Sequence, residues 1–253
     1  MTGGPDAMRT RGRSFGSVAA GYAALRPSYP ADAVGSLLAG TARPARVLDV
    51  GASTGLLSEV VLAAGHEVVA VDPSREMLGE LTARLPRVGT AVGTAESLPV
   101  ADRCVDAVVA GQAAHWFDPA PAAREIRRVL RPGGVLGLVW NTRDVRVPWI
   151  AALEEVIDDE ARGHEADQRV VDAFVAELDA EVGMTESGIV QRVAPEDVVG
   201  GIATRSYVAV MDAARREQFL SRVRRLLDGH PGTRGRPVLE LRYVTHAYRL
   251  APR

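Results

Sequence analysis

Short runs of apolar residues alternate with amphipathic stretches along the first 145 residues of the chain. The apolar runs contain almost no polar positions, so they predict strands that are buried on both faces. The amphipathic stretches between them predict helices. Strands are predicted at 47–50, 67–71, 88–92, 105–110 and 135–140, and helices at 31–38, 56–64, 73–85 and 122–130. This alternation favours a parallel sheet with helices on both faces.

The pattern changes near Pro148. Beyond it, helices are predicted at 149–162, 170–178 and 213–227, a short helix begins at Pro195, and strands are predicted at 189–193 and 239–250. A helix followed by a strand at the end of the chain suits the edge of a sheet. We therefore expect five regions: a mobile tail (1–14), an N-terminal helical lid (15–43), a central core (44–145), a helical cap (146–212), and a C-terminal helix and edge strand that complete the core (213–253).

Small, polar and aromatic residues gather where the predicted parallel strands end. The ligand site of such a sheet lies beyond the carboxyl ends of its strands. The first strand is followed by a Gly/Ser/Thr turn at 51–55, and the second ends on Asp72. Glycines let a backbone approach a ligand closely, and the acid can accept hydrogen bonds from a ribose diol, so this pair predicts an adenine nucleoside site. The alternative is a plain strand-to-helix corner beside a surface Asp.

Composition limits the classes of function. The chain has 253 residues, of which 47% are hydrophobic and 25% charged, so it can bury a core without disulfides or metal. A formal net charge of -2 does not favour broad binding to nucleic acid or to an anionic membrane. All 30 basic residues are Arg, which excludes a Schiff-base lysine. The sequence has one cysteine, Cys104, and shows neither a signal-peptide pattern nor a membrane-spanning pattern. These features predict a cytoplasmic protein.

Five segments resemble, in order and spacing, the motifs of class I S-adenosylmethionine-dependent methyltransferases: Val47-Leu-Asp-Val-Gly-Ala-Ser-Thr-Gly55, Val71-Asp72, Gly93-Thr-Ala-Glu-Ser-Leu-Pro99, Val105-Asp-Ala-Val-Val109 and Leu130-Arg-Pro-Gly-Gly134. The resemblance implies S-adenosyl-L-methionine as the cofactor. It also implies a Rossmann-like three-layer α/β sandwich, with a seven-stranded, mostly parallel sheet, an antiparallel last strand and a small helical cap. Segments 22–30, 114–118 and 243–248 are similar to the trans-aconitate methyltransferase-like branch.

The resemblance implies which residues hold the cofactor. Asp49 and Gly51 would lie under its methionine moiety, and Gly55 would allow close approach of the backbone. Asp72 would bind both ribose hydroxyls. The other expected contacts are Ala95 and Glu96 at the adenine, and Tyr22, Ala52, Ser53, Pro73 and Gln112.

Two positions depart from the family pattern. Ser53 stands where the middle glycine of the turn is usual, and it fits if its backbone is not left-handed. Thr94 stands where an acid often meets the adenine amino group. The second departure weakens the expected adenine contacts without removing the site.

His115 is the titratable base at the strand ends with a suitable intrinsic pKa. Its alternative is a structural role, packing or bonding a neighbouring carbonyl. A hydroxyl or amine acceptor would need such a base, whereas a carboxylate is already nucleophilic. The branch resemblance implies a small carboxylic acid that becomes a methyl ester. Candidates for binding this substrate are Arg26 and Arg143 as carboxylate ligands and Tyr29, Trp116, Phe117 and Trp149 as aromatic lining.

Three alternatives stay open. A dinucleotide oxidoreductase would need a third glycine where Leu56 stands. A base-amino nucleic-acid methyltransferase would need an Asn/Asp-Pro-Pro-aromatic motif in place of the residues at 112–117. A non-catalytic module that binds the cofactor is the third. We expect a small-molecule acceptor as partner, no nucleic acid, no membrane and no metal ligand set; the oligomeric state is not predicted.

Overall fold

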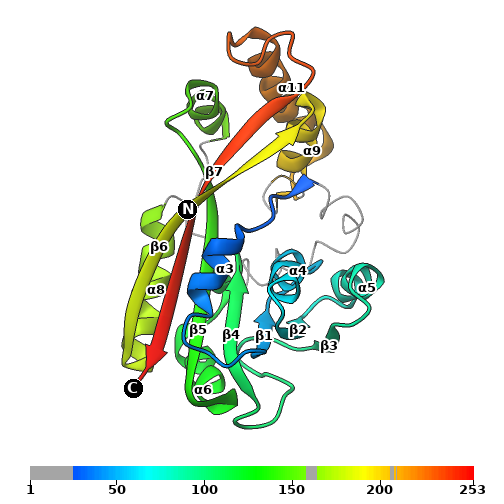
Figure 1. Cartoon of the computed structure of the whole chain (residues 1–253). Helices are drawn as coiled ribbons and strands as arrows, with labels where there is room; N and C mark the ends of the chain where they lie inside the picture. Colours follow the sequence, from blue (N-terminus) through cyan, green and yellow to red (C-terminus); the bar gives the residue numbers. More distant parts are fainter. Residues whose placement is uncertain (1–24, 158–163, 206–207, 209) are drawn as a thin grey trace.

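A computed structural model describes residues 25–157, 164–205, 208 and 210–253. Within these ranges the chain forms one seven-stranded sheet with helices on both faces, and a helical cap stands over the end of its longest strands (Figure 1). The three-layer arrangement predicted from the alternation of strands and helices is confirmed.

The strand order is β3-β2-β1-β4-β5-β7-β6. β1 pairs in parallel with β2 and β4, β2 pairs with β3, and β4 pairs with β5. β7 runs antiparallel to both β5 and β6, which confirms the predicted antiparallel last strand. The strands are β1 (Arg46–Val50), β2 (Glu67–Asp72), β3 (Gly89–Val92), β4 (Val105–Gly111), β5 (Leu130–Arg143), β6 (Ala180–Val193) and β7 (Leu239–Pro252).

One face of the sheet is covered by α3 (Ala31–Leu37), α4 (Leu56–Ala63) and α5 (Arg75–Arg84). These helices bury their apolar stripes against strand residues such as Val47 and Val139. The fit is close at α3, because a Cβ added at Gly137 would lie 3.1 Å from the Cβ of Leu37. Helix α3, within the predicted N-terminal lid of 15–43, thus packs against the core, and a lid function for this region stays a prediction.

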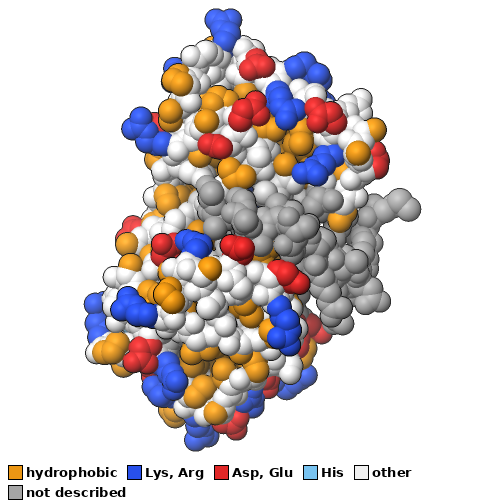
Figure 2. Space-filling view, turned by 90° about the vertical axis from the view of Figure 1, so that its right-hand side faces the viewer, with side chains coloured by type: hydrophobic (Ala, Val, Ile, Leu, Met, Phe, Trp, Pro, Cys, Tyr) orange, Lys and Arg blue, Asp and Glu red, His pale blue; other side chains and the backbone are white. Residues whose placement is uncertain are grey.

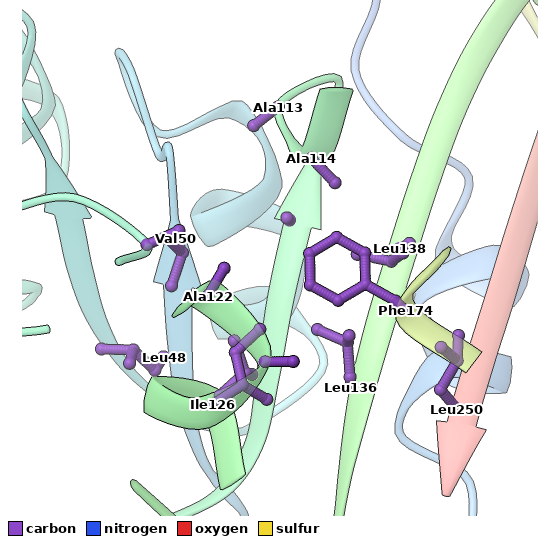
Figure 3. Close-up of a cluster of buried hydrophobic side chains, with 14 of the residues drawn as sticks. Leu48, Val50, Ala113, Ala114, Ala122, Ile126, Leu136, Leu138, Phe174 and Leu250 are labelled. Carbon is purple, nitrogen blue, oxygen red and sulfur yellow. The ribbon is translucent and has the colours of Figure 1, made fainter. Parts of the chain in front are cut away.

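The other face is covered by α6 (Pro119–Val129) and α8 (His164–Leu178). Figure 3 shows the ring of Phe174 from α8 against Leu136 and Leu138 of β5. Ile126 of α6 lies in the same cluster of buried residues. Each of these side chains is at most 1% exposed, and Val47 and Val139 on the opposite face are fully buried, so both faces of the central strands are dry, as their apolar sequence predicts.

The cap consists of α7 (Pro148–Ile157), α9 (Pro195–Ala203) and α11 (Ala213–Gly229). These helices share a separate hydrophobic cluster with one end of the long β6–β7 ribbon, including Leu239 and Tyr243 (Figure 1). The cap therefore stands on strands that are continuous with the main sheet. No helix among the described residues is long and apolar enough to cross a membrane.

β5 and β6 are much longer than the sequence predicts. β5 begins at Leu130, five residues before the predicted start, because the Pro-Gly-Gly stretch of 132–134 continues the strand past an irregularity in the β4–β5 register. β6 spans 14 residues where the prediction has 189–193. Among the described residues it is an edge strand that pairs with β7 alone, and its side chains are largely exposed, so its sequence lacks the apolar run of a central strand. Its place in the sheet also means that the predicted cap region of 146–212 contains an element of the core.

Candidate functional site

The turn after β1 depends on backbone conformations that side chains rarely adopt. Gly51 and Gly55 have φ angles of 71° and 86°. A Cβ at Gly51 would lie 2.6 Å from the Cβ of Ala113, and a Cβ at Gly55 would lie 2.7 Å from the side chain of Leu81. Space and conformation therefore both require glycine at these two positions.

Ser53 has a φ of 50°, so the middle of the turn is left-handed. Serine is expected to fit here only if its backbone is not left-handed, and that condition is not met. Ser53 therefore carries the cost of a left-handed conformation, about 1–2 kcal/mol. A hydrogen bond offsets part of this cost, because the backbone N–H of Ser53 donates to Oδ2 of Asp72 at 2.9 Å. The Ser53 hydroxyl contacts the sulfur of Met77 at 3.5 Å.

Asp72 holds the turn to the end of β2. Its Oδ2 accepts from Ser53, and its Oδ1 accepts from the backbone N–H of Ser74 at 2.8 Å, one residue before α5 begins. The residue is only 7% exposed; burial raises the pKa of the Asp72 carboxyl, and the two amide bonds oppose that rise. Each oxygen keeps a second lone pair, so the carboxylate can still accept two hydroxyl donors. Pro73, beside it, is exposed.

Asp49 is a second carboxylate in the neighbouring strand, and it is 1% exposed. Its Oδ2 accepts from the hydroxyl of Ser58 at 2.6 Å, whereas its Oδ1 is buried without a hydrogen-bond partner among the described residues. Burial raises the pKa of the Asp49 carboxyl to about 7; the Ser58 bond opposes the rise and the charge of Asp72 adds to it. An acceptor atom left unsatisfied inside the protein is what a donor or cationic group of a ligand would complete.

The loop after β3 is fixed by contacts that the sequence does not reveal. Ala95 is 2% exposed and belongs to the core, and Glu96 accepts the backbone N–H of Asp118 at 2.9 Å. Further along, Arg128 of α6 donates to the carbonyls of Leu98 and Val100, and Glu125 of α6 accepts the N–H of Leu98. Charged residues on a helix usually face solvent, so no sequence pattern shows that Glu125 and Arg128 hold the backbone of this loop.

A network built around Asn141 joins the ends of β4 and β5 to the middle of β7. The side chain of Gln112, a non-glycine residue with a φ of 54°, donates to the carbonyl of Asn141 at 2.7 Å. The Asn141 amide donates to the carbonyl of Ser28 at 2.9 Å and accepts from the hydroxyl of Thr245 at 2.6 Å. Asn141 is 8% exposed and Thr245 is fully buried, so the centre of the network is buried, whereas Gln112 is exposed. Asn141 directly follows the strand predicted at 135–140, and the sequence pattern assigns it no role.

Tyr29 lies against the end of β4. A Cβ added at Gly111 would be 2.5 Å from the Tyr29 hydroxyl oxygen, and Tyr29 is 8% exposed. Together with the Ser28 bond, this contact docks the segment of 26–30 onto the ends of β4 and β5. Arg26, in the same segment, is half-buried. Tyr22 and the tail of 1–14 lie outside the described residues.

His115 lies just beyond β4 in a single 3-10 turn, Ala114–Trp116. The indole N–H of Trp140 donates to its Nδ1 at 3.5 Å, and the ring of Trp116 stands 5.0 Å away between centroids. His115, Trp116 and Phe117 are all half-buried. A Cβ at Gly51 would lie 3.7 Å from the Phe117 ring, so this aromatic segment borders the turn.

Arg143 and Trp149, the remaining two residues expected to bind substrate, contact the helical cap. Arg143, at the end of β5, forms an ion pair with Glu154 of α7, and its side chain is 6% exposed. Trp149 is 6% exposed in the hydrophobic cluster of the cap, and its ring lies 3.3 Å from a Cβ placed on Gly232. Substrate binding by either residue stays a prediction.

The structure thus brings together the turn, Asp49, Asp72 and the end of β4 at the carboxyl edge of the parallel strands. The site offers paired acceptors for a diol, a buried carboxylate oxygen without a partner in the part of the chain that the structure describes, and a turn whose glycines leave no room for side chains. Such a constellation suits a nucleoside that carries a cationic tail.

Comparisons with known proteins agree with this chemistry. Residues 48–138 match the family model of the methyltransferase domain. An uncharacterized methyltransferase of Mycobacterium tuberculosis is 44% identical over 232 residues, which cover 92% of this chain and 93% of that protein. A malonyl-[acyl-carrier protein] O-methyltransferase of Methylococcus capsulatus is 40% identical over 135 residues, 49% of each chain. A solved structure of a candidate type II methyltransferase from Anaeromyxobacter dehalogenans has a TM-score of 0.67 at 26% identity and covers 90% of this chain and 97% of that one.

Proposed function

Because the chain belongs to the S-adenosylmethionine-dependent methyltransferase family, we propose that it methylates a small molecule at a carboxylate or a hydroxyl group. Bound S-adenosylmethionine supplies a methyl group that is already activated by its sulfonium. The protein must then align the acceptor behind that methyl and exclude water, and alignment alone can contribute about 7–11 kcal/mol.

The observation that carries the proposal is the pair of carboxylates around the turn. Asp72 would accept the two ribose hydroxyls on the lone pairs that its backbone amides leave open. Asp49 would face the methionine end, where its Oδ1, which has no partner among the described residues, can meet the positive charge of the cofactor. Gly51, Ala52, Ser53 and Gly55 would form the turn beneath it, with Pro73, Ala95, Glu96 and Gln112 as further contacts.

Two observations support a carboxylate as the acceptor group. The relative from Methylococcus is named as an O-methyltransferase of a malonyl carrier protein, and malonyl groups end in a carboxylate. The resemblance of three segments to the trans-aconitate methyltransferase-like branch also favours a carboxylic acid. A carboxylate oxygen attacks the methyl carbon without losing a proton, which suits a site that offers one histidine as a candidate base.

The surface supports a small acceptor rather than a nucleic acid. On the face in Figure 2, acidic and basic side chains of the described residues are interspersed over both ends of the molecule. Binding along a phosphate backbone would favour a broad field of positive charge, and the formal net charge of the chain is -2. The cytoplasmic location stays a prediction.

The test is a methyl-transfer screen with labelled cofactor across three acceptor classes: carboxylic acids including a malonyl thioester, phenols and amines. We expect label in a product that mild alkali cleaves, because methyl esters hydrolyse there and aryl methyl ethers and methylamines do not. Cofactor binding without transfer to any class would instead favour the non-catalytic alternative, and transfer to amines alone would contradict the proposed acceptor.

A further inference from the structure

The segment of 25–30, here called the strap, joins the helical cap to the carboxyl ends of the parallel strands. At its first residue, a Cβ added at Gly201 of α9 would lie 3.2 Å from the backbone oxygen of Leu25, and a Cβ added at Gly200 would lie 3.1 Å from the Leu25 side chain. A glycine inside a helix costs about 1 kcal/mol relative to alanine. What these two adjacent glycines allow is the close approach of the strap to α9.

The other end of the strap lies at the end of β4. A Cβ on Gly111 would lie 2.5 Å from the Tyr29 hydroxyl oxygen and 3.2 Å from Leu57, in the first turn of α4. Tyr29 also belongs to the buried cluster that contains Ala52, in the turn of 51–55. The strand order reverses between β1 and β4, because β2 and β3 lie on one side of this pair and β5 on the other. Ligands of such sheets bind in the crevice at this reversal, so the strap borders that crevice.

Asn141 fixes the strap between these two contacts. Its side-chain amide donates to the carbonyl of Ser28 at 2.9 Å and accepts from the Thr245 hydroxyl at 2.6 Å. A carbonyl can only accept, so the nitrogen of the amide must face Ser28. Thr245 is fully buried in β7, and it holds the oxygen of the same amide. The strap thus receives a hydrogen bond whose donor is oriented by the interior of the sheet.

We propose that the strap closes the acceptor end of the site, and that Asn141 is the positioning residue that holds it closed. The inference rests on the proposed methyl transfer and adds the element that shields its reacting atoms. Asp72 and the turn of 51–55 hold the adenosine part on the side of β1 and β2, so the acceptor is left the side of β4 and β5, which the strap borders. Closure there aligns the acceptor and excludes water, and the acceptor enters and leaves when the strap lifts.

Two variants test the hydrogen bond to Ser28. Thr245→Val removes the hydroxyl that orients the amide; adding Asn141→Leu also removes the donor to Ser28, and leaves no buried polar group on either side chain. Relative to Thr245→Val, we expect the double variant to exchange the backbone hydrogens of 25–30 faster and to lose kcat/KM for the malonyl thioester, each by about three- to tenfold, the weight of one hydrogen bond. Calorimetric affinity for S-adenosylmethionine should be the same in both. Equal exchange in the two variants, or a loss of cofactor affinity as large as the loss of kcat/KM, would overturn the positioning role.

A disulfide tests the closure itself. The Cβ of Leu25 lies 3.9 Å from a Cβ placed on Gly201, within the span that a disulfide bridges. In a Cys104→Ser background, Leu25→Cys with Gly201→Cys should therefore cross-link the strap to α9 on oxidation.

We expect the oxidised protein to lose most of its turnover of the malonyl thioester and a reductant to restore it, whereas Leu25→Cys alone should respond to neither treatment. Full turnover by the oxidised, cross-linked protein would show that the strap need not lift, and would overturn the closure. Methyl transfer to none of the acceptor classes by the wild type would contradict the proposed function instead. The hydrogen-exchange comparison needs no acceptor, so it decides the role of Asn141 in that case too.

Discussion

At the scale of single residues, two carboxylates in adjacent strands have different environments. Asp72 is satisfied by two backbone amides, whereas Asp49 keeps one buried oxygen without a partner among the described residues. The protein thus holds Asp49 in a state that is costly in the absence of ligand. Binding sites often carry such local costs, which a ligand then relieves.

Asp49 gives the free protein a specific pH dependence. Its pKa is about 7 when folded and 3.8 as the reference value, so between these values the folded state binds more protons than the unfolded state. The free energy of unfolding should therefore fall as pH rises from about 4 to 7, by up to about 1.4 kcal/mol per pH unit. Denaturant unfolding of wild type and Asp49→Asn at several pH values measures this, and the wild type should lose stability relative to the variant as pH rises towards 7. Parallel curves would show that Asp49 titrates normally.

The sequence predicts residues whose role follows from local pattern, and misses those whose role depends on distant partners. Gly51, Gly55 and Asp72 were predicted because turn chemistry and strand ends are local. Asn141 was not given a role, because its partners Ser28 and Thr245 lie 113 and 104 residues away. The role of each predicted site residue stays a prediction until binding is measured.

At the scale of elements, the segment of 26–30 is docked by a glycine and by an amide network. Gly111→Ala would place a Cβ 2.5 Å from the Tyr29 hydroxyl oxygen, so the Tyr29 ring must shift and its hold on the segment of 26–30 is weakened. We expect the free energy of unfolding to fall by about 1–3 kcal/mol, and protease cleavage near 26–30 to become faster. Gly183→Ala in β6 is the matched control, since no atom lies within 4 Å of its added Cβ, and should change stability by less than about 0.5 kcal/mol. Equal effects of the two variants would mean that Tyr29 does not rest on Gly111.

Element prediction succeeded where the hydrophobic pattern was strong. The central strands β1, β2 and β4 were predicted to within a residue or so, because burial on both faces leaves a continuous apolar run. β6 was mostly missed because an edge strand with exposed side chains needs no such run; its extent is determined by pairing with β7, which lies far along the chain.

At the scale of the whole molecule, the long strands connect the two ends of the protein. β5, β6 and β7 each have 14 residues, and the cap helices stand on the ends of β6 and β7 beyond the parallel strands. The ion pair of Arg143 with Glu154 joins the end of β5 to α7. The predicted seven-stranded, mostly parallel sheet with an antiparallel last strand is confirmed. The cap packs on β6 and β7 because these strands extend beyond the parallel strands, and the sequence pattern does not predict the full length of β6.

The central claim is that Asp72 and the turn at 51–55 together hold the adenosine part of the methyl donor. Calorimetric titration of S-adenosylmethionine and its demethylated product into wild type, Asp72→Ala and Asp106→Ala tests it most directly. Asp106 is the matched control, because it also accepts a backbone N–H, from Arg46 at 2.7 Å, but lies at the opposite end of the strands. We predict that Asp72→Ala weakens binding by about 1.5–3 kcal/mol and that Asp106→Ala leaves it unchanged; wild-type affinity in folded Asp72→Ala would contradict the account.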